Sequence, residues 1–308
     1  MTPRRGSTIA LCGVMLVLCV AARLPAQARA STDVWIVPIR DAGTALTVGA
    51  PRNLTHRAGY DNQPSFTRAG DALFYTSIGD DEQADIWRVS VTGGAPVRLT
   101  RTPESEYSAT ATPDGRFFSV IRVERDSTQR LWKFPLDGAG EPELVLRDVM
   151  PVGYHVWAGD HQLVLQVLGG ALNSPSQGRN TLQLADDRTG RSEIVGRLVG
   201  RALVKVPGRD AVTFQQLVRD SASWIAELDV RTGATRRLMQ PPRGADYHAW
   251  TPGGLLVTAV GSKLYIWVNG DWGVAADLGA YGVKGITRIA VSPKGDWLAF
   301  VAEDRPAP

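Results

Sequence analysis

A glycine-centred turn recurs along the chain at nearly regular intervals and restricts the possible folds more than any other feature. The turns carry Gly70, Gly115, Gly159, Gly208, Gly254 and Gly295, which are 45, 44, 49, 46 and 41 residues apart. The fuller copies have an apolar residue, three turn-type residues and Gly, as in residues 291–295. A period of about 40–45 residues is typical of a four-stranded propeller blade. The spacing therefore predicts a repeat fold built from such units.

Each unit has the composition of consecutive β-strands. After the glycine turn comes a short apolar run, such as Leu73-Phe74-Tyr75. A third strand follows, usually with an aromatic residue, and a turn such as Gly93-Gly94 leads into the fourth. β-branched and aromatic residues bounded by Gly, Pro, Asp and Asn favour strands. The third strands carry Trp35, Trp87, Trp132, Trp224 and Trp267, which we expect to pack between sheets instead of forming a carbohydrate platform.

The two ends of the repeat region complement each other. Residues 33–36 match the third strand of a unit and residues 51–55 match the fourth, whereas residues 289–295 and 297–301 match the first and second. One blade is therefore predicted to be shared between the N-terminal and C-terminal strands. With five complete units, the prediction is an all-β, six-bladed β-propeller, whose closure leaves only short strand edges.

Residues 1–30 are predicted to be a signal peptide. Arg4 and Arg5 are followed by an apolar run from Ile9 to Ala22 and then by small residues at positions 26, 28 and 30. The run is shorter than the roughly 20 residues that a membrane-spanning helix needs. An uncleaved anchor remains an alternative. A lipoprotein is disfavoured, because bulky Leu18 precedes Cys19. Residues 31–308 are predicted to form a single propeller domain in the periplasm or outside the cell, with no membrane span in the mature chain.

Removal of this segment changes the charge and the cysteine count. The chain has 34 basic and 31 acidic residues. Four of the basic residues and none of the acidic ones lie in residues 1–30, so the remainder is nearly neutral. No basic stripe then suggests nucleic acid. Both cysteines, Cys12 and Cys19, also lie there. The mature chain would therefore have no disulfide, no thiolate metal site and no cysteine nucleophile.

The repeat resembles that of TolB-like C-terminal propellers, which are WD40-like. The fullest copy runs through residues 53–55, 61–66, 85–87, 93–94 and 98–100. Similar propellers occur in TolB, in prolyl oligopeptidase-type peptidases and in oligogalacturonate lyases, so the resemblance implies a fold and leaves the function open. TolB has an additional α/β domain and the peptidases have a hydrolase domain. We expect neither here, because the leader runs directly into a blade.

Two matched tetrapeptides are the strongest candidates for a site. Tyr154-His155-Val156-Trp157 and Tyr247-His248-Ala249-Trp250 occupy the same register of two units, on the innermost strand near the channel mouth. The candidate ligand-binding residues are Tyr154, His155, Tyr247, His248, Asp61, Asn62, Glu106, Tyr107, Asp246 and Arg288. Such side chains around one axis would form a polar funnel for a ligand. The alternative is that they pack between blades, since repeats generate matched positions anyway.

Catalytic signatures are missing from the sequence. There is no G-x-S-x-G, H-E-x-x-H or phosphate-binding glycine loop. His155 and His248 with Asp61, Glu106 or Asp246 could ligate a divalent cation, but no close ligand spacing supports this. We therefore expect no metal, no cofactor and no catalytic residue. The prediction is an exported, non-enzymatic propeller that binds an envelope or periplasmic protein, or a small ligand, at the channel face. The alternative is a metal-assisted enzyme of the sugar-acid lyase or hydrolase type, with its site in the channel.

Overall fold

The structure is a computed structural model that describes residues 31–79, 81–169, 179–218 and 223–303. Its regular elements there are β-strands and one short 3-10 helix, η1 (Gly279–Tyr281). No helix in these ranges is long and apolar enough to cross a membrane. The predicted signal peptide, residues 1–30, lies outside the described residues. The predicted all-β class is confirmed.

Four antiparallel sheets of four strands follow one another along the chain. The first contains β8 (Ser105–Ala111), β9 (Phe117–Val123), β10 (Gln129–Pro135) and β11 (Glu143–Leu144). The second contains β12 (Val152–Trp157), β13 (Gln162–Val167), β14 (Thr181–Asp186) and β15 (Ser192–Arg197). The third contains β16 (Val199–Lys205), β17 (Ala211–Leu217), β18 (Ser223–Asp229) and β19 (Thr235–Met239). The fourth contains β20 (His248–Trp250), β21 (Leu256–Val260), β22 (Lys263–Val268) and β23 (Asp271–Asp277).

A nine-stranded sheet joins the two ends of the described chain. Its strands are β1 (Thr32–Asp41), β2 (Leu46–Val48), β3 (Arg52–Asn53), β4 (Tyr60–Phe66), β5 (Ala72–Ile78), β6 (Ala84–Ser90), β7 (Val97–Arg98), β24 (Thr287–Val291) and β25 (Trp297–Glu303). β25 lies between β24 and β1, and its register with β1 runs from Thr32↔Glu303 to Pro38↔Trp297. The predicted pairing of the N-terminal and C-terminal strands is therefore confirmed.

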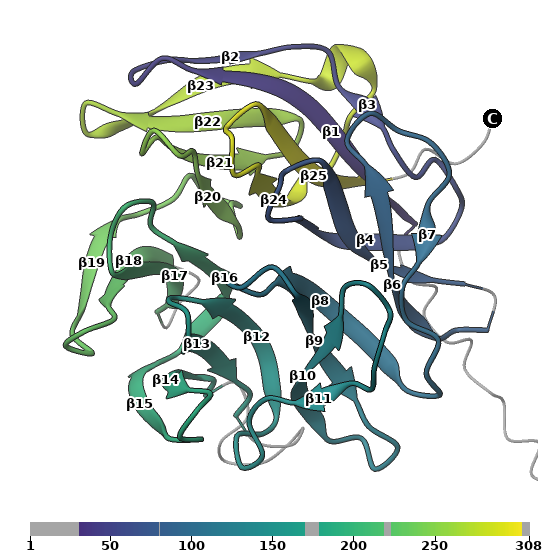
Figure 1. Ribbon diagram of the computed structural model, residues 1–308. Helices are drawn as coiled ribbons and strands as arrows, with labels where there is room; N and C mark the ends of the chain where they lie inside the picture. The colour runs from purple at the N-terminus through teal and green to yellow at the C-terminus, as the bar shows by residue number, and fades with distance from the viewer. Residues whose placement is uncertain (1–30, 80, 170–178, 219–222, 304–308) are drawn as a thin grey trace, which may run out of the picture.

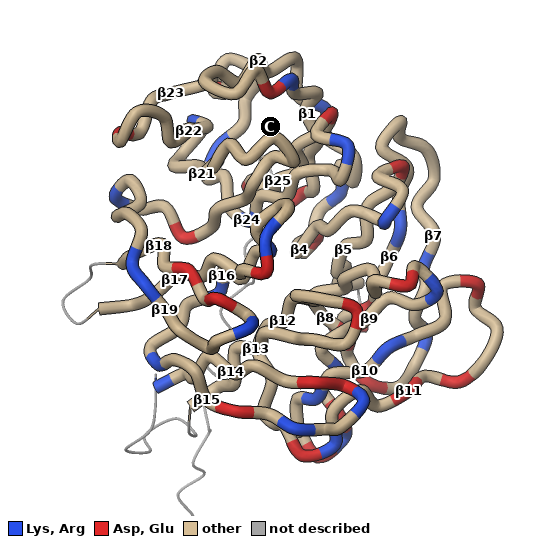
Figure 2. Tube along the Cα trace, turned by 60° about the vertical axis from the view of Figure 1, so that its left-hand side comes forward, with Lys and Arg blue, Asp and Glu red and all other residues tan. Residues whose placement is uncertain are grey.

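The sheets are arranged around a common axis (Figure 1). The first strand of each antiparallel unit is innermost, namely β4, β8, β12, β16, β20 and β24. Basic and acidic residues are interspersed along the chain and form no continuous stripe of one sign in the view of Figure 2.

Apolar side chains pack between neighbouring sheets. Phe74 of β5 stacks on Phe118 of β9 with ring centroids 5.4 Å apart. Both rings are almost fully buried, as are Val164 of β13 and Phe214 of β17, which share another cluster. Each fully buried side chain of this size contributes roughly 1.5–3 kcal/mol. Three of the third-strand tryptophans, Trp35, Trp87 and Trp132, are partly buried and pack against the core clusters. Trp224 instead lies under the guanidinium of Arg237, and Trp267 contacts Trp272 edge to face.

Candidate functional site

Six side chains meet at the axis, one from each innermost strand or the residue beside it. They are Tyr60 at the start of β4, Tyr107 on β8, Tyr154 on β12, Arg201 on β16, Tyr247 just before β20, and Arg288 on β24. We refer to these six residues as the channel cluster. Burial raises the pKa of Tyr60, and the Arg288 guanidinium partly offsets this, while three other tyrosines of the cluster also act on the same hydroxyl. Residues more than two hundred positions apart are thus in one electrostatic neighbourhood.

Arg288 reaches across the axis. Its Nη2 donates a hydrogen bond of 2.8 Å to the hydroxyl of Tyr154. Its guanidinium carbon lies 5.0 Å from the ring centroid of Tyr154 and 4.7 Å from that of Tyr247. β24 and β12 are separated by two other innermost strands in either direction around the ring, so the contact spans the axis. The cation lies between two aromatic faces, where cation–π attraction holds it in place.

A β-bulge sets the direction of the Arg288 side chain. The register of β24 against β25 shifts between Thr287 and Ala290, and Arg288 has φ of 49°. The same irregularity occurs in β4 and β8, where Gln63 and Ser108 have φ of 58° and 55°. This left-handed region is unusual for residues other than Gly. A bulge re-aims a side chain that simple strand alternation would place elsewhere.

The cluster holds more positive than negative charge. Arg288 forms no ion pair within the described residues. Tyr154 and Tyr247 raise the pKa of Arg201, while burial opposes the rise, and Asp246 adds a smaller contribution. Burial raises the pKa of Tyr247 despite the two arginines. Within the described residues, the cluster therefore brings two guanidiniums together with one nearby carboxylate, that of Asp246 beside Arg201, and this excess of positive charge favours an anion.

A cavity of about 450 Å³ opens beside the channel cluster. Tyr154, Arg201 and Asp246 line it together with the glycines of β12 and β16. Its polar lining also includes four side-chain amides, those of Gln129, Gln166, Asn180 and Gln215. The cavity and the cluster share Tyr154 and Arg201, so they form one continuous site on the channel face. We refer to the cavity as the amide pocket.

His155 and His248 do not line the channel. They are 7% and 3% exposed, and their Nε2 atoms lie 2.7 Å from Ser119 Oγ and 2.9 Å from Thr213 Oγ1 of the preceding sheets. The interpretation that both rings line a ligand funnel is wrong, and for these two residues the alternative of packing between sheets holds. Neighbouring residues of a strand point to opposite faces, so a tyrosine in the channel sends the adjacent histidine between the sheets. Burial lowers the pKa to about 3 for His155 and about 4 for His248.

The predicted carboxylates of the first two units also lie away from the cluster. Asp61 is fully buried and pairs with Arg57 at 2.6 Å. Glu106 is equally buried and accepts hydrogen bonds from Thr102 and Arg122, and burial raises its pKa. We expected both to face the volume bounded by the tyrosines. Their charges are instead compensated by Arg57 and Arg122.

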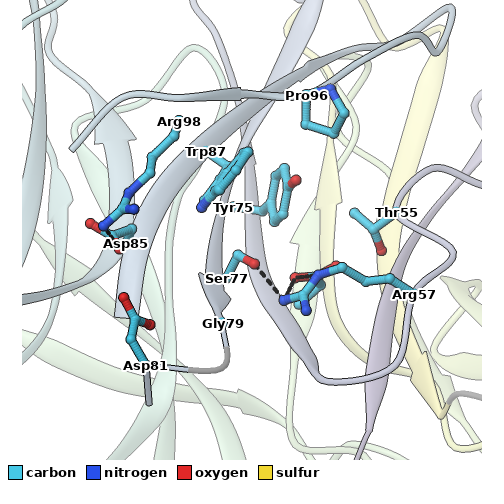
Figure 3. A pocket seen from close by; sticks show the side chains of 11 residues that line it. Thr55, Arg57, Tyr75, Ser77, Gly79, Asp81, Asp85, Trp87, Pro96 and Arg98 are labelled. Carbon is cyan, nitrogen blue, oxygen red and sulfur yellow. Dashed lines mark hydrogen bonds and ion pairs between the residues drawn. The ribbon is translucent and has the colours of Figure 1, made fainter. Parts of the chain in front are cut away.

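Asp61 belongs to a second cavity of about 490 Å³. Figure 3 shows Arg57 directed toward Ser77, with the rings of Tyr75 and Trp87 beside them. Arg98 forms an ion pair with Asp85 on the other side of the cavity. Four of the charged groups that line this cavity thus already form ion pairs with one another: Arg57 with Asp61 and Arg98 with Asp85.

The sequence-predicted residues thus fall into two groups. The structure gathers Tyr107, Tyr154, Tyr247, Asp246 and Arg288 at the channel. It places His155, His248, Asp61, Asn62 and Glu106 in buried positions, where Asn62 donates to Thr32.

Sequence reasoning missed Tyr60 and Arg201. Arg201 follows Gly200 as Tyr154 follows Gly153, in the same register, and this repeated Gly–long-side-chain pair could have identified it. The described residues contain no group of three or more His, Cys, Asp or Glu positioned to hold a metal ion.

The fold is a β-propeller similar to that of TolB proteins. No protein-family model and no curated protein matches the sequence. Among solved structures, a putative TolB from Agrobacterium tumefaciens superposes with a TM-score of 0.67 and 16% identity, over 90% of this chain and 99% of that one. TolB from Acinetobacter baumannii gives 0.57 and 12%, over 89% of this chain and 64% of that longer one.

An enzyme with a similar fold is also found. A gluconolactonase from Xanthomonas campestris superposes with a TM-score of 0.61 and 13% identity, over 87% of this chain and 95% of that one. Identities of this size establish the fold alone, and one fold can carry unrelated functions.

Proposed function

We propose that this protein is an exported, non-enzymatic propeller that binds a ligand or protein partner at its channel face by holding an anionic group. The domain would be one six-bladed propeller over residues 31–308, with residues 1–30 as a cleaved signal peptide. The nine-stranded sheet supports this count, because one parallel pair, Thr32↔Tyr60, connects its β24–β25–β1–β3 part to its β4–β7 part. Counted separately with the four other sheets, these parts give six blades.

The observation that carries the proposal is the charge of the channel cluster. Arg288 is held between two tyrosine rings with no carboxylate partner in the described chain, and Arg201 lies beside the same rings. Placing two guanidiniums together with only the Asp246 carboxylate beside them costs free energy unless a further anion joins them. Phenol hydroxyls from three sides can donate further hydrogen bonds to that anion.

A carboxylate fits this arrangement. A guanidinium offers parallel N–H donors at the spacing of the two carboxylate oxygens, and charge-assisted bonds of this kind are roughly twice as strong as neutral ones. A small acid or an acidic group on a protein partner would satisfy it equally well. The cavity of about 450 Å³ beside the cluster gives such a group room to enter.

Calorimetric titration of the purified protein with acetate, succinate and citrate tests the proposal. We expect saturable binding of at least one acid, weakened about tenfold or more by Arg288→Gln, because a charged hydrogen bond contributes roughly 1.5–3 kcal/mol. Arg237→Gln is the matched control, since Arg237 lies on β19 and covers Trp224 at the outer edge. Unsaturable binding, or equal effects of the two substitutions, would refute the proposal.

The fold shared with a gluconolactonase makes one enzymatic outcome worth measuring in the same experiment. Turnover of a lactone or of an unsaturated or glycosidic sugar acid, lost with Arg288→Gln and retained with Arg237→Gln, would replace the binding proposal by the enzymatic alternative.

N-terminal sequencing of the exported protein tests the localisation. Cleavage after Ala28 or Ala30 is expected, and an intact Met1 would contradict it.

A further inference from the structure

The amide pocket contains hydrogen-bonding groups that the fold itself does not satisfy. Gln166 is 1% exposed, and its Nε2 donates to the carbonyls of Val199 at 3.1 Å and Gly200 at 2.7 Å. These two bonds fix the amide, and its Oε1 has no partner within the described residues. An unpartnered buried acceptor is costly and uncommon in a folded protein. A donor that arrives with a ligand would remove this cost.

Two glycines keep room for the amides. A Cβ at position 153 would lie 2.6 Å from Gln166 Oε1, and one at position 200 would lie 2.0 Å from Gln215 Oε1. Neither glycine has positive φ, so the backbone conformation does not demand glycine there. The glycines instead permit each glutamine to fold back against the strand. Gln215 Nε2 lies 3.4 Å from Asp246 Oδ1, which links the amides to the acid of the site.

The remaining lining selects the kind of ligand. Leu168 and Leu217 are its aliphatic members beside glycines, amides, charges and one tyrosine. Most of the side chains that line the cavity carry hydrogen-bonding groups, which suits a ligand with several hydroxyl groups. Side-chain amides both donate to and accept from hydroxyl groups, and the Asp246 carboxylate accepts from them, while each hydroxyl carries one donor and two acceptor sites. A cavity of about 450 Å³ is within the range for small molecules.

We infer that the ligand of the channel face is a hydroxylated carboxylate of the sugar-acid class, with its carboxylate on Arg288 and Arg201 and its hydroxyl groups in the amide pocket. The inference rests on the proposed function and adds the ligand class. Tyr154 and Arg201 belong to both parts of the site, so one molecule can reach both. Specificity then comes from pairing each hydroxyl with an amide or with Asp246.

Three probes with six carbons separate the two parts of the site: glucuronate carries both features, glucose lacks the carboxylate and hexanoate lacks the hydroxyls. Calorimetry with the purified protein should show glucuronate binding at least about tenfold more tightly than either of the others, because each lost polar contact leaves a buried group unpaired. Gln215→Leu should reduce glucuronate affinity about tenfold and leave hexanoate binding unchanged.

Gln216→Leu is the matched control, because the side chain of Gln216 accepts a bond from Arg237 on β19 and does not line the pocket. Gly200→Ala is a second variant, since the new methyl would displace the Gln215 amide. Melting temperatures establish that each variant is folded. If Gln215→Leu fails to fold, Gly200→Ala carries the test.

The possible outcomes separate a failure of the sugar-acid inference from a failure of the proposed function. Hexanoate binding as tightly as glucuronate, with loss on Arg288→Gln, would overturn the sugar-acid inference and leave the anion site intact. An unchanged glucuronate affinity in both Gln215→Leu and Gly200→Ala would overturn it in the same way. Binding of no carboxylate at all, or binding indifferent to Arg288→Gln, would overturn the proposed function as well.

Discussion

His155 and His248 have the same structural role in different sheets. Each Nε2 contacts a hydroxyl of the preceding sheet, and the tryptophan two residues later donates to that hydroxyl at 2.9 Å. Burial keeps both rings neutral well below the ordinary pKa of 6.5. In each Tyr-His-x-Trp sequence the tyrosine therefore lies in the channel, whereas the histidine and the tryptophan contact the same hydroxyl of the preceding sheet and connect the two sheets.

The lowered histidine pKa values predict acid sensitivity. The unfolded chain binds protons to both rings as pH falls below 6.5, whereas the folded chain does not until pH reaches about 3–4. The stability that depends on the two neutral histidines is therefore fully present above pH 6.5 and decreases as the pH falls below this value. Each histidine should cost about 1.4 kcal/mol per pH unit in that window. In the double variant His155→Gln/His248→Gln, we expect the melting temperature to fall less steeply between about pH 7 and about pH 5 than it does in the wild-type protein. Parallel curves for both proteins would contradict the assignment.

At the scale of elements, the hydroxyl of Thr213 on β17 connects two sheets. It receives the Trp250 N–H and lies next to His248 from the following unit, and it donates to the carbonyl of Val204 at 3.3 Å. Removing it leaves two buried ring nitrogens without a partner. Such unpaired groups cost roughly 1–3 kcal/mol each.

Thr213→Val is therefore expected to lower the free energy of unfolding by about 2–6 kcal/mol, since it keeps the shape and removes the hydroxyl partner of both ring nitrogens. Thr213→Ser keeps the hydroxyl and loses one methyl, so its cost should be nearer 1 kcal/mol. Urea denaturation of the three proteins measures the difference. If Thr213→Ser were as destabilised as Thr213→Val, packing of the methyl and not the hydrogen bonds would connect the sheets.

The strands could be predicted from the sequence. The directions of the side chains could be predicted only in part. Glycine turns and alternating apolar residues depend on local chemistry, and they located the units and the pairing of the termini. Alternation also implied that Tyr154 and His155 face opposite ways, which the sequence argument did not apply. The bulge at Arg288 depends on tertiary packing, so its reach across the axis could not be predicted. Arg201 lacked any local signal except Gly200 before it.

At the scale of the whole molecule, the ring closes through one strand pairing. β25 provides the partner of β1 from Thr32 to Pro38, and it also separates β1 from β24. Leu298, Phe300 and Val301 of β25 are fully buried. Large apolar side chains contribute roughly 1.5–3 kcal/mol each when buried, whereas an entire domain is stable by only about 5–15 kcal/mol. The closing strands therefore carry a share of stability comparable with that of the whole domain.

Deletion of residues 282–308 should consequently unfold the entire protein instead of trimming one sheet. The truncation removes β24 and β25 and leaves the edge of β1 unpaired, next to Val34 and Ile36, whose burial depends on the same sheet. An unpaired edge of this length pairs with other chains, so aggregation is expected as well. Size-exclusion chromatography and thermal melting measure both effects, and deletion of residues 304–308 alone is the control, because it keeps β25 whole. A truncated chain that remains monomeric and melts like the full one would show that the sheets fold independently of closure. The pairing of β25 with β1 would then not be required for the stability of the other sheets.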